Sequence, residues 1–151
     1  MTGVSGRLLD HHLLRYLDAT AGPEPRAVLD IGPGRGKFAE YIRPRWPAAH
    51  LTAYEVDGEY VERFGLRALY QTVHVAPAAD LLAHHDQTWD LVTIGDVLEH
   101  MPKHVGLDLL HFLVYRARVI WFQWPERYIQ GPLEGHVSEV HVSVWGEADV
   151  Q

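Results

Sequence analysis

Short apolar runs alternate along the chain with segments in which apolar residues recur at helical spacing. The runs are bounded by turn residues and predict strands at 27–31, 50–57, 71–76, 89–96 and 116–124. Helical spacing predicts helices at 5–21, 37–42, 59–69, 97–101 and 105–115. Strands that alternate with helices form right-handed βαβ units. We therefore expect an α/β domain with a doubly wound parallel sheet of about five to six strands.

Composition narrows the class of protein. The chain has 151 residues, of which 47% are hydrophobic and 22% charged, and we expect a single domain over residues 1–151. Within it we expect an N-terminal helix at 1–22, a core at 26–124, and a loop with the start of a final helix at 125–151. The absence of cysteine excludes disulfides, thiolate zinc sites and a catalytic thiol, and it favours a cytoplasmic location.

Charge and hydropathy limit the partners. The net charge of −7 argues against binding to a nucleic-acid backbone. No apolar run approaches the roughly 20 residues of a membrane span, and the N-terminal stretch is too charged for the apolar core of a signal peptide. We therefore expect neither nucleic acid nor membrane as a partner.

A glycine-rich turn follows the first predicted strand. Gly32, Gly34 and Gly36 allow a tight turn and a close approach of the backbone to a ligand, and the next helix offers its first N–H groups. The spacing fits neither a dinucleotide fingerprint, which would have glycine in place of Lys37, nor a Walker A loop, which would have serine or threonine in place of Phe38. A nucleotide-like ligand is favoured over an ordinary strand-to-helix turn.

Glu55 ends the second predicted strand, about 20 residues beyond the glycine turn. A carboxylate at this place can accept hydrogen bonds from both hydroxyls of a ribose. Taken alone it could be a solvated strand end, but together with the turn it favours a nucleoside ligand.

Three motifs occur in a fixed order: VLDIGPGRGKF, AYEVD and WDLVTIGDVLEHMP. From about Val28 to Trp124 the chain resembles the class I S-adenosylmethionine-dependent methyltransferases, and the DVLEH segment resembles their ubiquinone-biosynthesis-type and small-molecule branch. The resemblance implies a Rossmann-like fold of methyltransferase type, with the core at 26–124 binding the cofactor. It also implies S-adenosylmethionine as cofactor, S-adenosylhomocysteine as product and a small-molecule methyl acceptor, whose reacting atom the sequence does not identify.

The same resemblance implies roles for single residues near the first two strands. Gly32, Gly34 and Gly36 would pass under the methionine part of the cofactor. Asp30 would order this loop or meet the amino group of the cofactor through water. Glu55 would bind the ribose.

Further cofactor contacts are expected from the later motifs. Val56 would flank the adenine, whereas Asp57 is expected to cap the next helix. Many family members carry an acid directly after the third strand for the adenine amino group. That position is Pro77 here, so Asp80 is the nearest carboxylate for this contact. Asp96, after the fourth strand, would line the cavity for cofactor and substrate.

Catalysis by alignment of methyl donor and acceptor requires few groups, and a base is needed only when the acceptor must lose a proton. His100 is the candidate general base, with packing or capping as the alternative.

We expect no metal. The alternative is a set formed by Asp96, Glu99, His100 and His141, which resembles the site of metal-dependent small-RNA 3′-terminal 2′-O-methyltransferases. His100 and His104 also have the i, i+4 spacing of a chelating pair. A third function remains open, a non-catalytic methyltransferase-like module that binds a nucleoside or a partner.

The C-terminal part is short for the family. Only 27 residues follow Trp124, so we expect the C-terminal hairpin of family members to be missing, in a compact or truncated form of the domain. The fifth strand would then be an apolar edge, which favours a homodimer through that edge. Residues 131–145 could instead form a covering loop or an added strand. Trp121, Trp124 and Tyr128 could line an aromatic substrate pocket or belong to the core.

Overall fold

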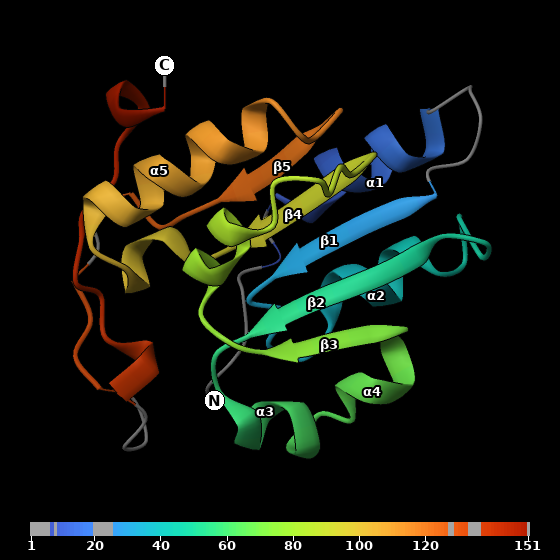
Figure 1. Ribbon diagram of the computed structural model, residues 1–151, viewed down its shortest axis with the longest axis horizontal. Coiled ribbons are helices and arrows are strands. Elements are labelled where there is room, and N and C mark those ends of the chain that lie inside the picture. Colours follow the sequence, from blue (N-terminus) through green and yellow to red (C-terminus); the bar gives the residue numbers. More distant parts are fainter. Residues whose placement is uncertain (1–6, 8, 20–25, 127–128, 133–136, 151) are drawn as a thin grey trace.

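Five parallel strands form the centre of the computed structural model, which describes residues 7, 9–19, 26–126, 129–132 and 137–150 (Figure 1). The strands lie in the order β3-β2-β1-β4-β5. Their bounds are β1 Ala27–Ile31, β2 His50–Glu55, β3 Thr72–Val75, β4 Leu91–Gly95 and β5 Ile120–Gln123. The strand order reverses direction at β1, so the α/β doubly wound, Rossmann-like parallel sheet expected from the sequence is confirmed. Within the described ranges no strand follows β5.

Helices connect the strands and cover the sheet. The α-helices are α1 Asp10–Ala19, α2 Lys37–Ile42, α3 Gly58–Arg63, α4 Leu66–Leu69 and α5 Lys103–Val114. The 3₁₀ helices are η1 Ala78–Ala83, η2 Leu98–His100, η3 Val137–Glu139 and η4 Glu147–Asp149. Among the described residues, no helix is long and apolar enough to cross a membrane.

Most elements lie within about two residues of the expected bounds, and the helix expected at 97–101 is the 3₁₀ helix η2. Two elements differ more. The helix expected at 59–69 is divided into α3 and α4 because Gly65 adopts the left-handed conformation, with φ of 61°. The last strand, expected at 116–124, begins only at Ile120, and before it Ala117 forms an isolated bridge with Trp89.

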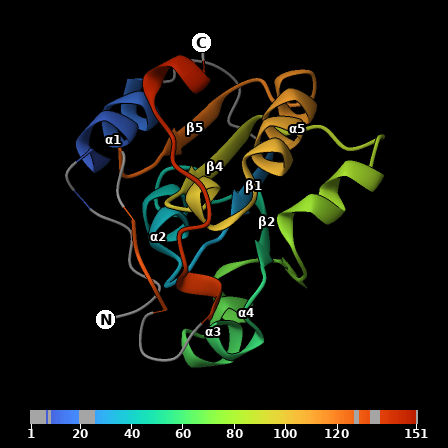
Figure 2. The ribbon, with the colours of Figure 1, turned by 90° about the vertical axis from the view of Figure 1, so that its left-hand side faces the viewer.

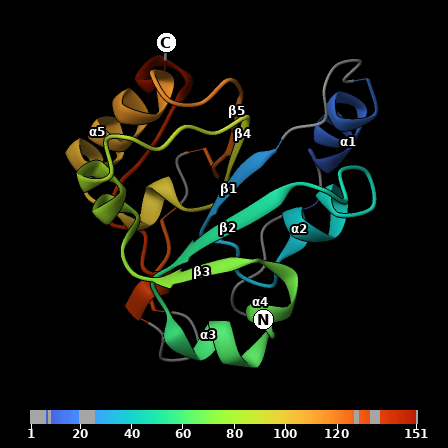
Figure 3. The ribbon, with the colours of Figure 1, turned by 45° about the vertical axis from the view of Figure 1, so that its right-hand side comes forward.

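Helices lie on both faces of the sheet (Figure 3). Each face carries a separate apolar layer. One layer contains Leu13 of α1 and Phe38 of α2, and the other contains Leu81 of η1 and Leu109 of α5. Helix α1 is fixed to α2 by a buried ion pair, in which Lys37 Nζ lies 2.9 Å from Asp10 Oδ1. Coverage of both faces is what a parallel sheet requires.

Residues 137–150, here called the strap, run across the carboxyl ends of the strands (Figure 2). The strap contains η3 and η4 and no strand, so among the described residues it is the covering segment rather than the added strand. Its anchor is Trp145, which is 1% exposed and packs with the α5 layer. The strap therefore lies at the sheet edge where doubly wound proteins bind ligands.

Candidate functional site

The glycine turn follows β1 at this edge. Gly32, Gly34 and Gly36 all have positive φ, of 64°, 52° and 81°. A side chain would also collide with the surroundings: a Cβ at Gly32 would lie 2.3 Å from Val97 Cγ2, and a Cβ at Gly36 would lie 2.4 Å from Leu69 Cδ1. The turn thus needs glycine for both conformation and space.

Glu55 meets this turn from the end of β2. Its side chain is 5% exposed, and its carboxylate accepts hydrogen bonds from Gly34 N at 3.3 Å and Asp57 N at 3.0 Å. Burial raises the pKa of Glu55, while the two backbone N–H groups partly offset this effect. The side chain of Asp57 accepts from Glu59 N at 2.9 Å, so its expected role as the cap of α3 is confirmed.

Asp30 lies beneath the turn, inside the sheet. It is 1% exposed, and its carboxyl group accepts hydrogen bonds from Tyr70 Oη and, at 2.8 Å, from Thr93 Oγ1. Burial raises the pKa of Asp30 to about 7. These contacts tie Asp30 to Tyr70 and to β4. Sequence reasoning missed both partners, although Thr93 lies opposite Asp30 in the β1–β4 register.

The remaining expected cofactor residues lie around the same edge. Val56 is 55% exposed next to Glu55. Asp80 is exposed on η1, and its charge adds to the effect of burial in raising the pKa of Tyr54. Asp96 follows β4 with φ of 53°, and its carboxylate accepts from Gln123 Nε2 at 3.4 Å.

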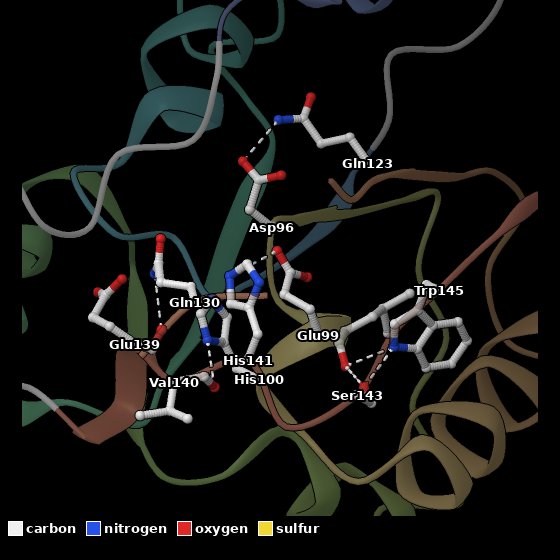
Figure 4. A network of polar contacts seen from close by, with 11 residues as sticks. Asp96, Glu99, His100, Gln123, Gln130, Glu139, Val140, His141, Ser143 and Trp145 are labelled. Atoms are coloured by element: carbon white, nitrogen blue, oxygen red, sulfur yellow. Dashed lines mark hydrogen bonds and ion pairs between the residues drawn. The ribbon is translucent and has the colours of Figure 1, made fainter. Parts of the chain in front are cut away.

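A second group of side chains lies beside Asp96, where the strap meets η2 (Figure 4). Glu99, His100 and His141 each place one potential metal-ligand atom within 4.8 Å of the others. Glu99 is 2% exposed, and the distance from His141 Nε2 to Glu99 Oε1 is 3.9 Å. Among the described residues the metal-ligand group contains neither Asp96 nor His104, which is exposed on α5.

Main-chain contacts hold the strap against η2. Val142 N and Ser143 N donate to the carbonyl oxygen of Glu99 at 2.8 and 3.1 Å. Trp145 Nε1 donates to the carbonyl oxygen of Leu98 at 3.0 Å. These hydrogen bonds place His141 next to η2.

The electrostatics of this group follow from its burial. Burial raises the pKa of Glu99 to about 8, and the nearby charges of Asp96 and Glu139 act in the same direction. Burial lowers the pKa of His100. His100 Nδ1 lies 3.1 Å from the carbonyl oxygen of Val140, which can only accept, so Nδ1 carries the proton and Nε2 keeps a lone pair in the neutral ring.

Comparison with known proteins identifies the fold family. Residues 5–114 match the family model described as "Methyltransferase domain", which is well over half of the chain. The chain belongs to this methyltransferase family.

Curated relatives of this methyltransferase domain are ubiquinone biosynthesis O-methyltransferases. The protein from Aromatoleum aromaticum is 34% identical over 93 residues, which cover 59% of this chain and 39% of the relative. The protein from Saccharophagus degradans is 31% identical over 91 residues, which cover 58% of this chain and 38% of the relative. The chain thus spans about two fifths of the length of these relatives.

Solved structures support the methyltransferase fold. The plantazolicin methyltransferase BpumL, in complex with a pentazolic desmethylPZN analogue and SAH, has a TM-score of 0.64 and 22% identity, over 80% of this chain and 48% of that one. A SAM-dependent methyltransferase from Archaeoglobus fulgidus has a TM-score of 0.56 and 26% identity, over 73% of this chain and 47% of that one.

The tryptophans near β5 belong to the packing of the methyltransferase domain. Trp121 packs against the layer of α1 and α2, and Trp124 against the layer of α5. Of the two interpretations left open by the sequence, these contacts favour the core. Tyr128 lies outside the described residues.

Proposed function

We propose that this domain binds S-adenosylmethionine at the glycine turn and transfers its methyl group to a small-molecule acceptor. The observation that carries the proposal is the contact between Glu55 and Gly34, in which a ribose-type acid meets a turn of three left-handed glycines. Membership of the methyltransferase family and the SAH in the BpumL complex support this choice of cofactor.

The proposed cofactor contacts begin at the glycine turn. Gly32, Gly34 and Gly36 would run beneath the methionine part, supported from below by Asp30. The carboxylate of Glu55 still has acceptor capacity beside its two backbone donors, since each carboxylate oxygen can accept more than one hydrogen bond. Ribose hydroxyls can therefore bind to it without displacing the turn.

On the adenine side we propose Val56, whose exposed side chain offers an apolar surface, and Asp80, which is exposed on η1. On the acceptor side we propose Asp96, beside η2. In this proposed arrangement the adenosine would lie over β2 and β3, and the reacting methyl group would lie nearer to β4.

His100 is the proposed base for an acceptor that must lose a proton. Its ring is oriented by the carbonyl oxygen of Val140, and burial favours the neutral form. Acceptors that need no deprotonation would react through alignment alone. The names of the curated relatives, which are O-methyltransferases, favour a hydroxyl acceptor.

Calorimetric titration with S-adenosylhomocysteine tests the cofactor site. We expect Glu55→Ala to weaken binding at least about tenfold, because hydrogen bonds to a charged group contribute about 1.5–3 kcal/mol each. Asp86→Ala is the matched control, since Asp86 is an exposed acid away from the turn. Equal effects of the two substitutions would contradict the ribose assignment, and a folded protein that does not bind the ligand would overturn the proposal.

Transfer of a labelled methyl group to a panel of hydroxylated metabolites separates an enzyme from a non-catalytic module. Neither the family nor the relatives above support the non-catalytic or the RNA-modifying alternative. That residues 1–151 form a single domain and that the protein is cytoplasmic stay predictions.

A further inference from the structure

The carboxyl group of Glu99 is the least satisfied polar group of the site. It is 2% exposed, and within the described part of the chain neither of its oxygens has a hydrogen-bond partner. A buried carboxylate costs several kcal/mol unless a cation or hydrogen-bond donors compensate it. The surrounding acids Asp96 and Glu139 do not supply this compensation. A cation bound beside Glu99 would supply this compensation.

Two imidazoles stand beside this carboxyl group (Figure 4). His141 Nε2 lies 3.9 Å from Glu99 Oε1, and the rings of His100 and His141 meet edge to face with centroids 4.8 Å apart. One potential ligand atom from each of the three residues lies within 4.8 Å of the others. Ligand atoms around a first-row metal ion are about 3–4 Å apart, so movements of about 1 Å would complete the set.

We propose that Glu99, His100 and His141 bind one divalent transition-metal ion, which joins the strap to the core. Two imidazole nitrogens and one carboxylate oxygen suit Zn²⁺, Mn²⁺ or Fe²⁺, whereas Mg²⁺ prefers oxygen ligands. Three protein ligands leave at least one coordination position for water or another oxygen donor. This site goes beyond the proposed methyl transfer and does not depend on it.

The strap also supplies the support that such a site needs. The carbonyl oxygen of Val140 accepts from His100 Nδ1, which fixes the ring and leaves Nε2 as the nitrogen with a lone pair. The next residue is the ligand His141, and the two residues after it donate main-chain hydrogen bonds to Glu99. Consecutive strap residues thus orient one ligand, provide another and anchor the third.

Ion binding is expected to hold the strap more firmly in the position that it occupies in this structure. On the other side of Val140, Glu139 accepts a hydrogen bond from Tyr60 Oη of α3 at 2.7 Å. An ion at His141 would therefore hold the segment that reaches from η2 to the α3 end of the proposed cofactor site. While the ion is bound, the Nε2 lone pair of His100 is used for coordination, so its role as a base belongs to the metal-free protein.

Titration of the tag-free protein with Zn²⁺ and with Mn²⁺ tests the site without cofactor or activity. We expect the wild type to bind one ion per chain tightly, as one tight equivalent. We expect His141→Ala and Glu99→Ala each to lower the affinity for this ion at least about 100-fold. His104→Ala is the matched control, because it removes the exposed histidine one turn after His100 and should leave the tight equivalent unchanged. Mg²⁺ should bind much more weakly than Zn²⁺.

Hydrogen exchange of the wild type provides a second measurement that does not depend on variants. Zn²⁺ should slow exchange at the amides of Val142 and Ser143, which donate to Glu99. Cooperative thermal unfolding without metal shows that each variant is folded, and His141→Gln replaces His141→Ala if the latter is not. The proposal is overturned if the wild type has no tight equivalent, if His104→Ala loses it as His141→Ala does, or if Zn²⁺ leaves the exchange of the strap unchanged. S-adenosylhomocysteine binding is measured separately, so failure of either site is recognised independently.

Discussion

Asp30 is a buried carboxyl group whose protonation should be visible in the stability of the domain. Burial raises its pKa from 3.8 to about 7, and the charge of Glu55 acts in the same direction. The hydrogen bonds from Tyr70 and Thr93 and the charge of Lys37 lower the pKa and offset part of this rise. Because the folded state binds this proton more tightly than the unfolded state, the contribution of Asp30 is most favourable below about pH 4 and is lost as the pH rises to about 7. Each unit of difference between the folded and unfolded pKa corresponds to about 1.4 kcal/mol of unfolding free energy.

Asp30→Asn should therefore flatten the dependence of the unfolding free energy on pH between about 4 and 7. Urea unfolding at a series of pH values measures this dependence, and Asp86→Asn serves as the control because Asp86 is exposed. If the curve of Asp30→Asn ran parallel to that of the wild type, Asp30 would not titrate in this range.

At the scale of residues, the sequence predicted those site members that sit directly on a strand end. Glu55 and the glycine turn belong to strands that are neighbours in the sheet, so their meeting follows from the topology. Tyr70 could not be predicted, since it reaches Asp30 from 40 positions away through tertiary packing. The same holds for His141, whose place beside Glu99 depends on the path of the strap.

The contact between the strap and α5 depends on a glycine in the helix. Gly106 of α5 lies under the ring of Trp145, and a Cβ there would be 2.5 Å from Trp145 Cζ2. Gly106→Ala improves helix propensity by about 1 kcal/mol, but overpacking against a rigid, buried ring costs about 1–3 kcal/mol. We expect the substitution to displace Trp145 and to release the strap from η2.

Hydrogen exchange at Ser143, next to this anchor, measures the release, together with thermal unfolding. Asp108→Ala is the control, since it changes an exposed position of the same helix and should leave the strap in place. Unchanged exchange in Gly106→Ala would show that the ring finds another position without loss of the strap contacts.

At the scale of elements, hydrophobic spacing predicted each strand of the sheet but not where all elements end. The division of the 59–69 segment at Gly65 is a left-handed turn, which apolar spacing does not reveal. The strap has no periodicity of its own because it is held by main-chain hydrogen bonds to η2 and by one tryptophan. Such segments are specified by tertiary contacts and stay ambiguous in a single sequence.

At the scale of the whole molecule, strand β5 forms one border of the sheet. Within the described residues no strand pairs with its outer side, and the strap donates its main-chain hydrogen bonds to Gln130 and Glu99 instead. Val119 and Gln123 accept hydrogen bonds from the β4 side, so the alternate residues Ile120 and Phe122 present their main-chain groups to the outer edge. An apolar edge of this kind favours pairing with a second copy.

We therefore expect the molar mass measured by light scattering to rise from monomer toward dimer as the concentration increases. Phe122→Pro removes one outward N–H group from the edge without removing a hydrogen bond to β4, and it should keep the protein monomeric. Phe122→Ala is the control, because it removes the same aromatic ring but retains the N–H group. A wild type that stays monomeric at high concentration, or equal association of the two variants in their folded state, would exclude β5 as the site of pairing.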